Sequence, residues 1–295
     1  MINDGIINAN MVSQTRPYIG SSLLHIAVDK GNKDVVEKLL ELGAQILVFD
    51  LKGRTPINIA NTNKLTAIRD LLNIKIKENI VANILYLAKD SHINSFEILK
   101  FLWGQYYNHK PLVPLHTSGS HKGWTFIHYA AAYGYELFFK FIVEKVFGIT
   151  GRIEDALSLS YETNSSSGAN LYSSTPLNLA IKNKRSNIVL LYVEMNCVFS
   201  RQYEVIYKIL IYFINQGDLS NLDMCLKKYA SEGTRIDVNY RDTSDEKHKN
   251  WTLLHYAAAI GNYTILVYLR GDLRGDLSLI TDDGFTVIDI AIING

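Results

Sequence analysis

Apolar residues recur along this chain at helical spacing, in short stretches separated by polar turns. The first stretch places Leu24, Ala27 and Val28 at the i, i+3, i+4 spacing of one helix face. The second has its apolar residues at Val35, Val36, Leu39 and Leu40. Gly31 and Gly43 end the two stretches, since glycine readily takes the left-handed conformation that closes a helix. The pattern predicts a hairpin of two short helices, which must stack on a neighbour to bury its apolar face.

The start of this hairpin recurs as a tetrapeptide with Ser or Thr in first place. A hydroxyl there can cap free helical N–H groups, and Pro in second place already has the helical φ. The copies begin at Ser22, Thr55, Thr125, Thr175, Thr252 and Thr286. The first and last gaps are 33 and 34 residues, and the gap of 70 is close to two periods. Helical patterns without the tetrapeptide, between Ile80 and Trp103 and between Tyr203 and Tyr229, predict two degenerate units.

The sequence also contains a second repetition, longer than the period of about 33 residues. Residues 121–134 and 248–261 are identical at ten of fourteen positions and stand 127 residues apart. We therefore expect a block of three units, at about 53–150 and 173–276, to occur twice.

The segments Gly20 to Val28, Gly31-Asn32 and Val35 to Ala44 resemble the ankyrin repeat, and the resemblance extends with gaps over most of the chain. It implies an all-α solenoid of helix hairpins with about eight units, two of them degenerate, and with loop insertions. We expect residues 1–19 to be an N-terminal cap or leader and residues 20–295 to form the solenoid. The units begin near residues 20, 53, 77, 123, 173, 200, 250 and 284. The last unit is truncated, so we expect the natural protein to continue beyond Gly295 or the chain to have been cut there.

Composition narrows the classes of function. Lys plus Arg total 30 and Asp plus Glu total 29, so no charge excess exists to hold nucleic acid. Hydrophobic residues make up 47% of the chain, which is typical of a folded protein. The sequence has no apolar run of membrane-spanning length and no secretory signal. We expect a soluble intracellular monomer.

Catalytic and metal-binding motifs are absent from the sequence, so we expect no enzyme activity, metal or cofactor in this segment. His109, His116 and His121 share one insertion and could approach a metal, although loop histidines are more often solvated. Cys197 and Cys225 lie among apolar helical residues and are interpreted as core. Two Arg-Gly-Asp tripeptides, at residues 270–272 and 274–276, are interpreted as polar turns rather than as an integrin motif.

The resemblance also assigns roles to single residues. It implies structural roles for the residues that cap first helices or hydrogen-bond the adjoining turn: His25, His128, His255, Thr55, Thr125, Thr175 and Thr252. It places partner-binding residues on the finger loops and first helices: Arg54, His121, Lys122, Trp124, Tyr133, Tyr172, Lys182, His248, Lys249, Trp251 and Phe285. Trp124 and Trp251 are the favoured contacts, because Trp often carries binding energy at interfaces. The alternative is that each indole packs on the neighbouring finger and only stiffens it.

The leading hypothesis is therefore recognition of protein partners. A second is that this chain is the targeting part of a larger enzyme whose catalytic domain lies beyond residue 295. A third is an enzyme that uses loop residues such as the histidine group. The degenerate repeats, rich in Ile and Asn and poor in Ala, resemble ankyrin effectors that intracellular bacteria deliver into host cells. That resemblance implies a host protein as partner and the host cytoplasm as the site of action, with a eukaryotic or viral adaptor as the alternative.

Overall fold

The computed structural model describes residues 8–89, 93–106, 114–115, 121–150, 175–195, 203–231, 233–241 and 247–295. Within these ranges the regular structure is helical, which confirms the predicted all-α repeat fold. The helices are α1 (Leu23–Asp29), α2 (Lys33–Glu41), α3 (Pro56–Thr62), α4 (Thr66–Glu78), α5 (Ile80–Lys89), α6 (Ile93–Tyr106), α7 (Phe126–Tyr133), α8 (Glu136–Thr150), α10 (Pro176–Lys182), α11 (Ser186–Glu194), α12 (Tyr203–Asn215), α13 (Leu219–Ser231), α14 (Leu253–Ala259), α15 (Tyr263–Gly271) and α16 (Val287–Asn294).

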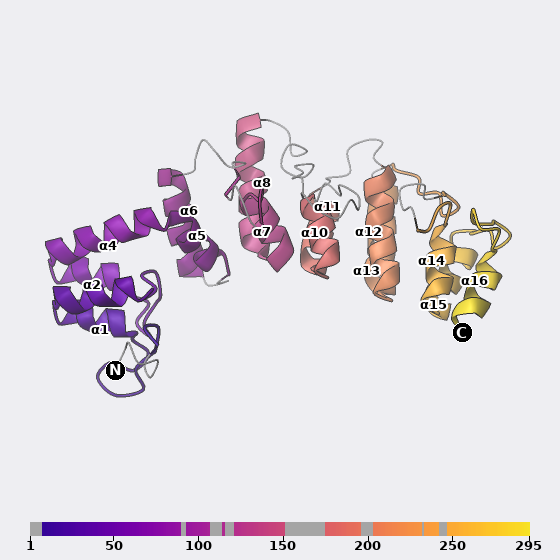
Figure 1. Ribbon diagram of the computed structural model, residues 1–295. Coiled ribbons are helices and arrows are strands. Elements are labelled where there is room, and N and C mark those ends of the chain that lie inside the picture. The colour runs from indigo at the N-terminus through magenta and orange to yellow at the C-terminus, as the bar shows by residue number, and fades with distance from the viewer. Residues whose placement is uncertain are drawn as a thin grey trace. The chain divides into compact units, whose positions relative to one another are not determined.

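Successive helices pair as hairpins, and the hairpins stack in register. In the N-terminal part, α1 packs against its partner α2 and against α3, while α2 also contacts α4 (Figure 1). In the C-terminal part, α14 packs against α15, α12 and α16. First helices therefore contact first helices of neighbouring repeats, and α2 contacts α4 in the other layer. This is how apolar faces that no single hairpin can cover are buried.

The chain divides into two compact units. The first contains the described residues up to Ala130 and those from Tyr135 to residue 150. The second contains residues 131–134 and the described residues from 175 onward. Each unit has its own buried apolar core, and the units are considered separately below.

The first hairpin shows why the sequence adopts this structure. Ser22 caps α1, and the Asn32 side chain caps α2 by accepting the N–H of Val35 at 3.1 Å. Val36 and Leu39 are buried, whereas Val35 is 42% exposed, so the buried face of α2 is narrower than the sequence pattern predicted. Val35 differs because a helix turns about 100° per residue and only one of two adjacent side chains can face the core.

The degenerate units are also helix pairs. Helices α5 and α6 contact each other extensively, as do α12 and α13, although neither pair begins with the tetrapeptide. Trp103 of α6 is fully buried, and its ring centroid lies 5.2 Å from that of Phe126 and 5.6 Å from that of Phe141. Aromatic packing thus joins α6 to α7 and α8 within the first unit.

None of the helices in the described ranges combines the length and the apolar character needed to cross a membrane.

Candidate functional site

The imidazole of His25 closes the start of α1 and joins it to the next finger loop. Its Nδ1 atom lies 2.8 Å from Ser22 Oγ and 3.2 Å from the Ser22 backbone nitrogen, and its Nε2 atom lies 2.9 Å from the Arg54 carbonyl oxygen. Because the N–H of Ser22 can only donate, Nδ1 is the acceptor and Nε2 carries the proton that the Arg54 carbonyl accepts. Burial lowers the pKa of His25 below the ordinary value of 6.5. The neutral ring therefore links two repeats.

Two more histidines occupy the same place in later repeats. His128 Nδ1 lies 3.1 Å from the Thr125 backbone nitrogen and 3.0 Å from Thr125 Oγ1. His255 Nδ1 lies 3.1 Å and 2.9 Å from the corresponding atoms of Thr252. Burial lowers the pKa of His255, against the opposing effect of the Phe285 and Leu279 carbonyls. Both rings thus lie in the caps, where sequence analysis placed them.

Side-chain oxygen atoms replace the imidazole nitrogen in the repeats that begin at Thr55 and Thr286. Thr55 Oγ1 donates to Asn58 Oδ1 at 2.8 Å, and Thr286 Oγ1 donates to Asp289 Oδ2 at 2.6 Å. In the repeat that begins at Thr175, the Thr175 hydroxyl accepts the backbone N–H of Asn178 at 3.2 Å. Sequence analysis assigned structural roles to Thr55 and Thr175 but not to Asn58 or Asp289, although their fourth place in the tetrapeptide was the signal that could have identified them.

The finger loop that precedes α3 is built around Asp50. This carboxylate accepts the backbone N–H groups of Lys52 and Arg54, both at 2.9 Å, and the Arg54 guanidinium at 2.7 Å. Burial raises the pKa of Asp50, but the hydrogen bonds from Arg54 and Lys52 outweigh it and lower the pKa overall. Arg54 was predicted to bind a partner; in the structure its guanidinium is held by Asp50 and its carbonyl by His25. Leu51, by contrast, is 76% exposed at the loop tip.

Trp124 lies in a cluster of rings at the start of α7. Its centroid is 4.4 Å from that of His121, edge to face, and 5.0 Å from that of Tyr129. The His121 and Tyr129 rings stack at 5.4 Å. Only 7% of Trp124 is exposed, so a partner could reach little of its indole. Burial favours the packing alternative for this residue.

The same cluster recurs in the second unit with a more open indole. The Trp251 centroid is 4.4 Å from that of His248 and 5.2 Å from that of Tyr256. Trp251 is half-buried, as is His248. The repetition of residues 121–134 at 248–261 thus brings the same three kinds of ring together, although the His and Tyr rings stack in the first cluster and lie edge to face in the second. Of the two indoles, Trp251 is the less completely buried.

The finger loops of the second unit are hydrogen-bonded to each other. The N–H of Asp282 lies 3.4 Å from the Lys249 carbonyl, and the Asn250 amide donates to the Asp282 carboxylate. The loop 281–285 closes on itself, because the N–H of Thr281 donates to the Phe285 carbonyl at 2.9 Å. These bonds fix the loops from which the Lys249 and Phe285 side chains extend.

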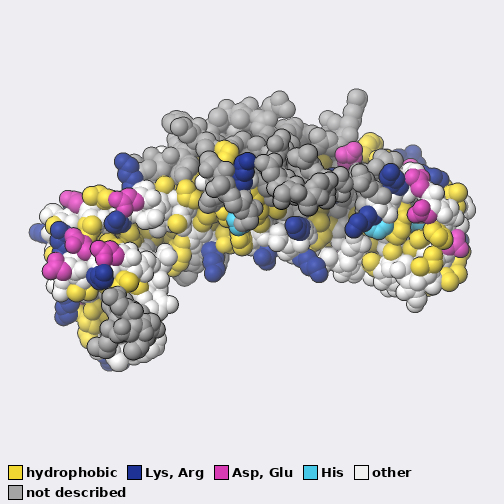
Figure 2. Space-filling view, in the orientation of Figure 1, with side chains coloured by type: hydrophobic (Ala, Val, Ile, Leu, Met, Phe, Trp, Pro, Cys, Tyr) yellow, Lys and Arg dark blue, Asp and Glu magenta, His cyan; other side chains and the backbone are white. Residues whose placement is uncertain are grey.

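The remaining predicted contacts differ in accessibility. Lys122, Lys182 and Lys249 are exposed, and Tyr133 and Phe285 are 45% and 40% exposed. Tyr172 lies outside the described residues. In the space-filling view, exposed apolar side chains lie beside basic and acidic ones on each unit (Figure 2). The face seen in Figure 2 therefore carries mixed apolar, basic and acidic side chains rather than charges of a single sign.

Of the candidate metal and thiol groups, the structure describes His121 and Cys225. In the described ranges, no three His, Cys, Asp or Glu side chains are grouped to hold a metal ion, while His109 and His116 lie outside those ranges. Cys225 is fully buried, and burial raises the pKa of its thiol to about 12. Cys197 lies outside the described residues.

Part of the chain is similar to a known family. Residues 20–51 match the family model described as ankyrin repeat. The solved structures include a match to the crystal structure of the ankyrin repeat domain of Bcl-3, described as a unique member of the IkappaB protein family. That match has 16% sequence identity and a TM-score of 0.34, and it covers 92% of this chain and 94% of the other. No curated protein matches the sequence.

Proposed function

We propose that this chain, which carries an ankyrin repeat at residues 20–51 and folds into stacked helix hairpins, is a protein–protein interaction module. The observation that carries the proposal is the construction of its finger loops. In the loops 50–54 and 281–285, several backbone N–H groups are hydrogen-bonded within the chain, while Leu51, Lys52 and Phe285 extend into solvent.

The first unit illustrates this construction. The Asp50 carboxylate accepts the backbone N–H groups of Lys52 and Arg54, and His25 fixes the loop to α1 through the Arg54 carbonyl. Leu51 and Lys52 are left exposed at the tip. A loop fixed before binding loses little conformational entropy when a partner docks, so more of the contact energy is retained as affinity.

The second unit supports the same function. Its fingers are joined by the hydrogen bond from the Asp282 N–H to the Lys249 carbonyl. Phe285 and Trp251 remain partly accessible, and Lys249 is exposed. Aromatic anchors surrounded by polar groups are typical of energetically important contacts at protein interfaces.

A matched pair of double variants in the first unit tests the proposal. Leu51→Ala with Lys52→Glu changes the finger tip, whereas Ile74→Ala with Lys77→Glu makes the same kinds of change on exposed positions of α4. Proteins captured from cell lysate by the tagged chain are quantified for both variants. We expect at least about a tenfold loss of specific partners for the finger variant and little change for the α4 variant.

The second unit is tested with Phe285→Ala and Lys249→Glu, against Tyr263→Ala and Arg270→Glu on α15. Circular dichroism of each variant checks that the fold is kept. Capture that is unchanged in both finger variants, with the fold intact, would refute recognition through the fingers.

The finer proposal is that the partner is a host protein and that this chain acts as a delivered effector. Its support is the Ile- and Asn-rich, Ala-poor composition of the degenerate repeats. Proximity labelling in cultured eukaryotic cells that express the chain tests it. We expect host proteins whose labelling falls in the finger variants and persists in the helix controls; labelling that is equal in all variants argues against a host partner.

A further inference from the structure

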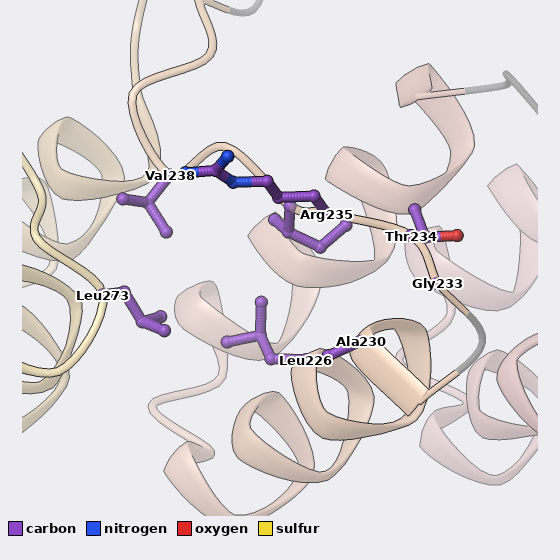
Figure 3. A pocket seen from close by; sticks show the side chains of 8 residues that line it. Leu226, Ala230, Gly233, Thr234, Arg235, Val238 and Leu273 are labelled. Carbon is purple, nitrogen blue, oxygen red and sulfur yellow. The ribbon is translucent and has the colours of Figure 1, made fainter.

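A pocket of about 320 Å³ lies in the second unit beside the C-terminal end of α13. One side is formed by Leu226 and Ala230 of α13, and the segment that follows α13 contributes Val238. Leu273, in the turn after α15, lines the opposite side, and Arg235 lies along the upper edge in the view of Figure 3. The pocket is therefore built from the end of a helix, the irregular segment that follows it and the turn after α15.

The pocket combines an apolar interior with a cation at its edge. Leu226 and Val238 are 6% and 3% exposed, so their side chains form fixed walls. Arg235 is exposed and makes no ion pair within the described part of the chain. Asp237, the acid closest to it in sequence, accepts the N–H of Asn239 at 2.9 Å. The guanidinium is thus available to an acid from outside.

The backbone beside the pocket is also available. Residues 234–237 belong to no helix or turn, and the N–H of Thr234 bonds to the Tyr229 carbonyl at 2.9 Å. Among described residues, the N–H and carbonyl groups of Arg235 and Ile236 have no hydrogen-bond partner. An extended peptide can pair with such a segment through main-chain hydrogen bonds and place alternate side chains into a pocket.

The size and lining limit the occupant. Sites for whole small-molecule ligands range from roughly 300 to 1,000 Å³, so this pocket is at the lower end and suits one large side chain. Its apolar walls would leave a phosphate group without hydrogen bonds, which is costly. The single cation at the edge suits a carboxylate next to an apolar group.

We propose that this pocket, called here the Arg235 pocket, receives a leucine-like aliphatic side chain from an extended acidic segment of a partner protein. A carboxylate next to that side chain pairs with the Arg235 guanidinium. The inference rests on the proposed function as a protein-binding module and adds the chemistry of the partner segment.

Three fluorescein-labelled peptides test the inference directly by fluorescence polarisation with the full chain. One has leucine flanked by glutamates, one has leucine flanked by lysines, and one has serine flanked by glutamates. We expect the first to bind at least about tenfold more tightly than the other two, because only it carries both the apolar group and the acid.

Two variants alter the pocket by different means. Arg235→Glu reverses the charge, and Ala230→Phe fills the pocket from an exposed position that the core does not require. Each should weaken the glutamate–leucine peptide by about tenfold or more, while Arg241→Glu, an exposed cation outside the pocket lining, should change it by less than about twofold. Equal binding of the three peptides, or binding that Ala230→Phe leaves unchanged, overturns the inference.

Other occupants give distinct results. Displacement of the peptide by octanoate as effectively as by unlabelled peptide would show a site for small fatty acids and overturn the inference. A dimer in sedimentation that Ala230→Phe abolishes would show contact between copies and would also overturn it. The peptide measurement needs no captured partner, so the two proposals can fail separately. If the peptides do not bind, the capture experiment on the finger loops still tests the proposed function. If the finger variants leave capture unchanged, peptide binding still tests the Arg235 pocket.

Discussion

Replacement of His25 tests whether the fourth residue of the tetrapeptide both caps its helix and links two repeats. His25→Asn keeps a side-chain acceptor for the cap, as Asn58 does naturally after Thr55. The shorter side chain cannot also donate to the Arg54 carbonyl, which His25 Nε2 approaches at 2.9 Å. His25→Ala removes both interactions and also the volume of a ring that is 1% exposed.

The structure separates the expected energies. Loss of the bond to the Arg54 carbonyl costs about 1 kcal/mol. Loss of the cap adds about 1 kcal/mol, and a cavity at a buried position adds about 1 kcal/mol or more. We therefore expect His25→Asn to lower the free energy of unfolding by about 1–2 kcal/mol and His25→Ala by about 3 kcal/mol or more.

The pH dependence has a defined sign. Burial lowers the pKa of His25 in the folded chain below the ordinary value of 6.5, so the unfolded chain binds the proton more readily. The stability that the neutral ring contributes is present above pH 6.5 and is lost as pH falls through the lowered pKa. His25→Asn has no such titration, so its deficit relative to the wild type should shrink on acidification.

Urea unfolding followed by circular dichroism measures this at about pH 8 and about pH 5.5, on either side of the histidine range. Titration of other groups cancels when the variant and the wild type are compared at one pH. The reasoning is refuted if His25→Asn is as destabilising as His25→Ala at the higher pH. It is equally refuted if the deficit of His25→Asn grows as the pH falls.

Three further predictions use other contacts. Trp124→Ala should lower the free energy of unfolding by about 3–5 kcal/mol and Trp251→Ala by less, because the second indole is less completely buried; equal losses in urea unfolding would contradict the packing described. Gly20→Ala should destabilise by about 1 kcal/mol or more, since Gly20 has a φ of +77° and an added Cβ would lie 2.3 Å from Leu51 Cγ. Combining it with Leu51→Ala should recover the steric part of that loss but not the backbone part, and full recovery in thermal unfolding would mean that the φ angle carries no cost. Cys225, whose thiol has a pKa of about 12, should resist iodoacetamide at pH 8 in the folded chain and react once the chain is unfolded in urea. Alkylation is measured by mass spectrometry, and rapid alkylation of Cys225 in the native chain would contradict its burial.

The helix starts were predictable because they depend on local chemistry. A hydroxyl at Thr55 or Thr252 can cap only the helix that follows within the next three residues, so its partner lies within the sequence window itself. The all-α repeat fold followed from the same pattern combined with its period. The pattern did not decide which side of α2 would be buried at Val35 and Val36, because both adjacent residues are apolar. Packing in the folded chain buries Val36 and leaves Val35 exposed.

The candidate site was less predictable. Sequence spacing marked Trp124 and Trp251 equally, since both precede a capping threonine within the repeated segment. Their exposures differ because the exposure of each indole depends on all the residues packed around it and not only on the identical neighbours within the repeated segment. Arg54 was predicted to contact a partner from its place in a finger. Its guanidinium pairs with Asp50 while 41% of its side chain stays exposed, and the role of Asp50 becomes visible only when the turn closes. The Arg235 pocket could not be foreseen, because Leu273 reaches it from a different hairpin.

The sequence by itself thus determined the repeated hairpins, their capping residues and the absence of a charge excess, since each depends on composition or on residues within one turn of each other. Only the tertiary structure decided which finger side chains remain accessible and which are committed to neighbouring repeats. The physical reason is that accessibility depends on contacts between residues about one repeat apart, such as His25 with Arg54 and Asn250 with Asp282. Such contacts exist only after the hairpins stack.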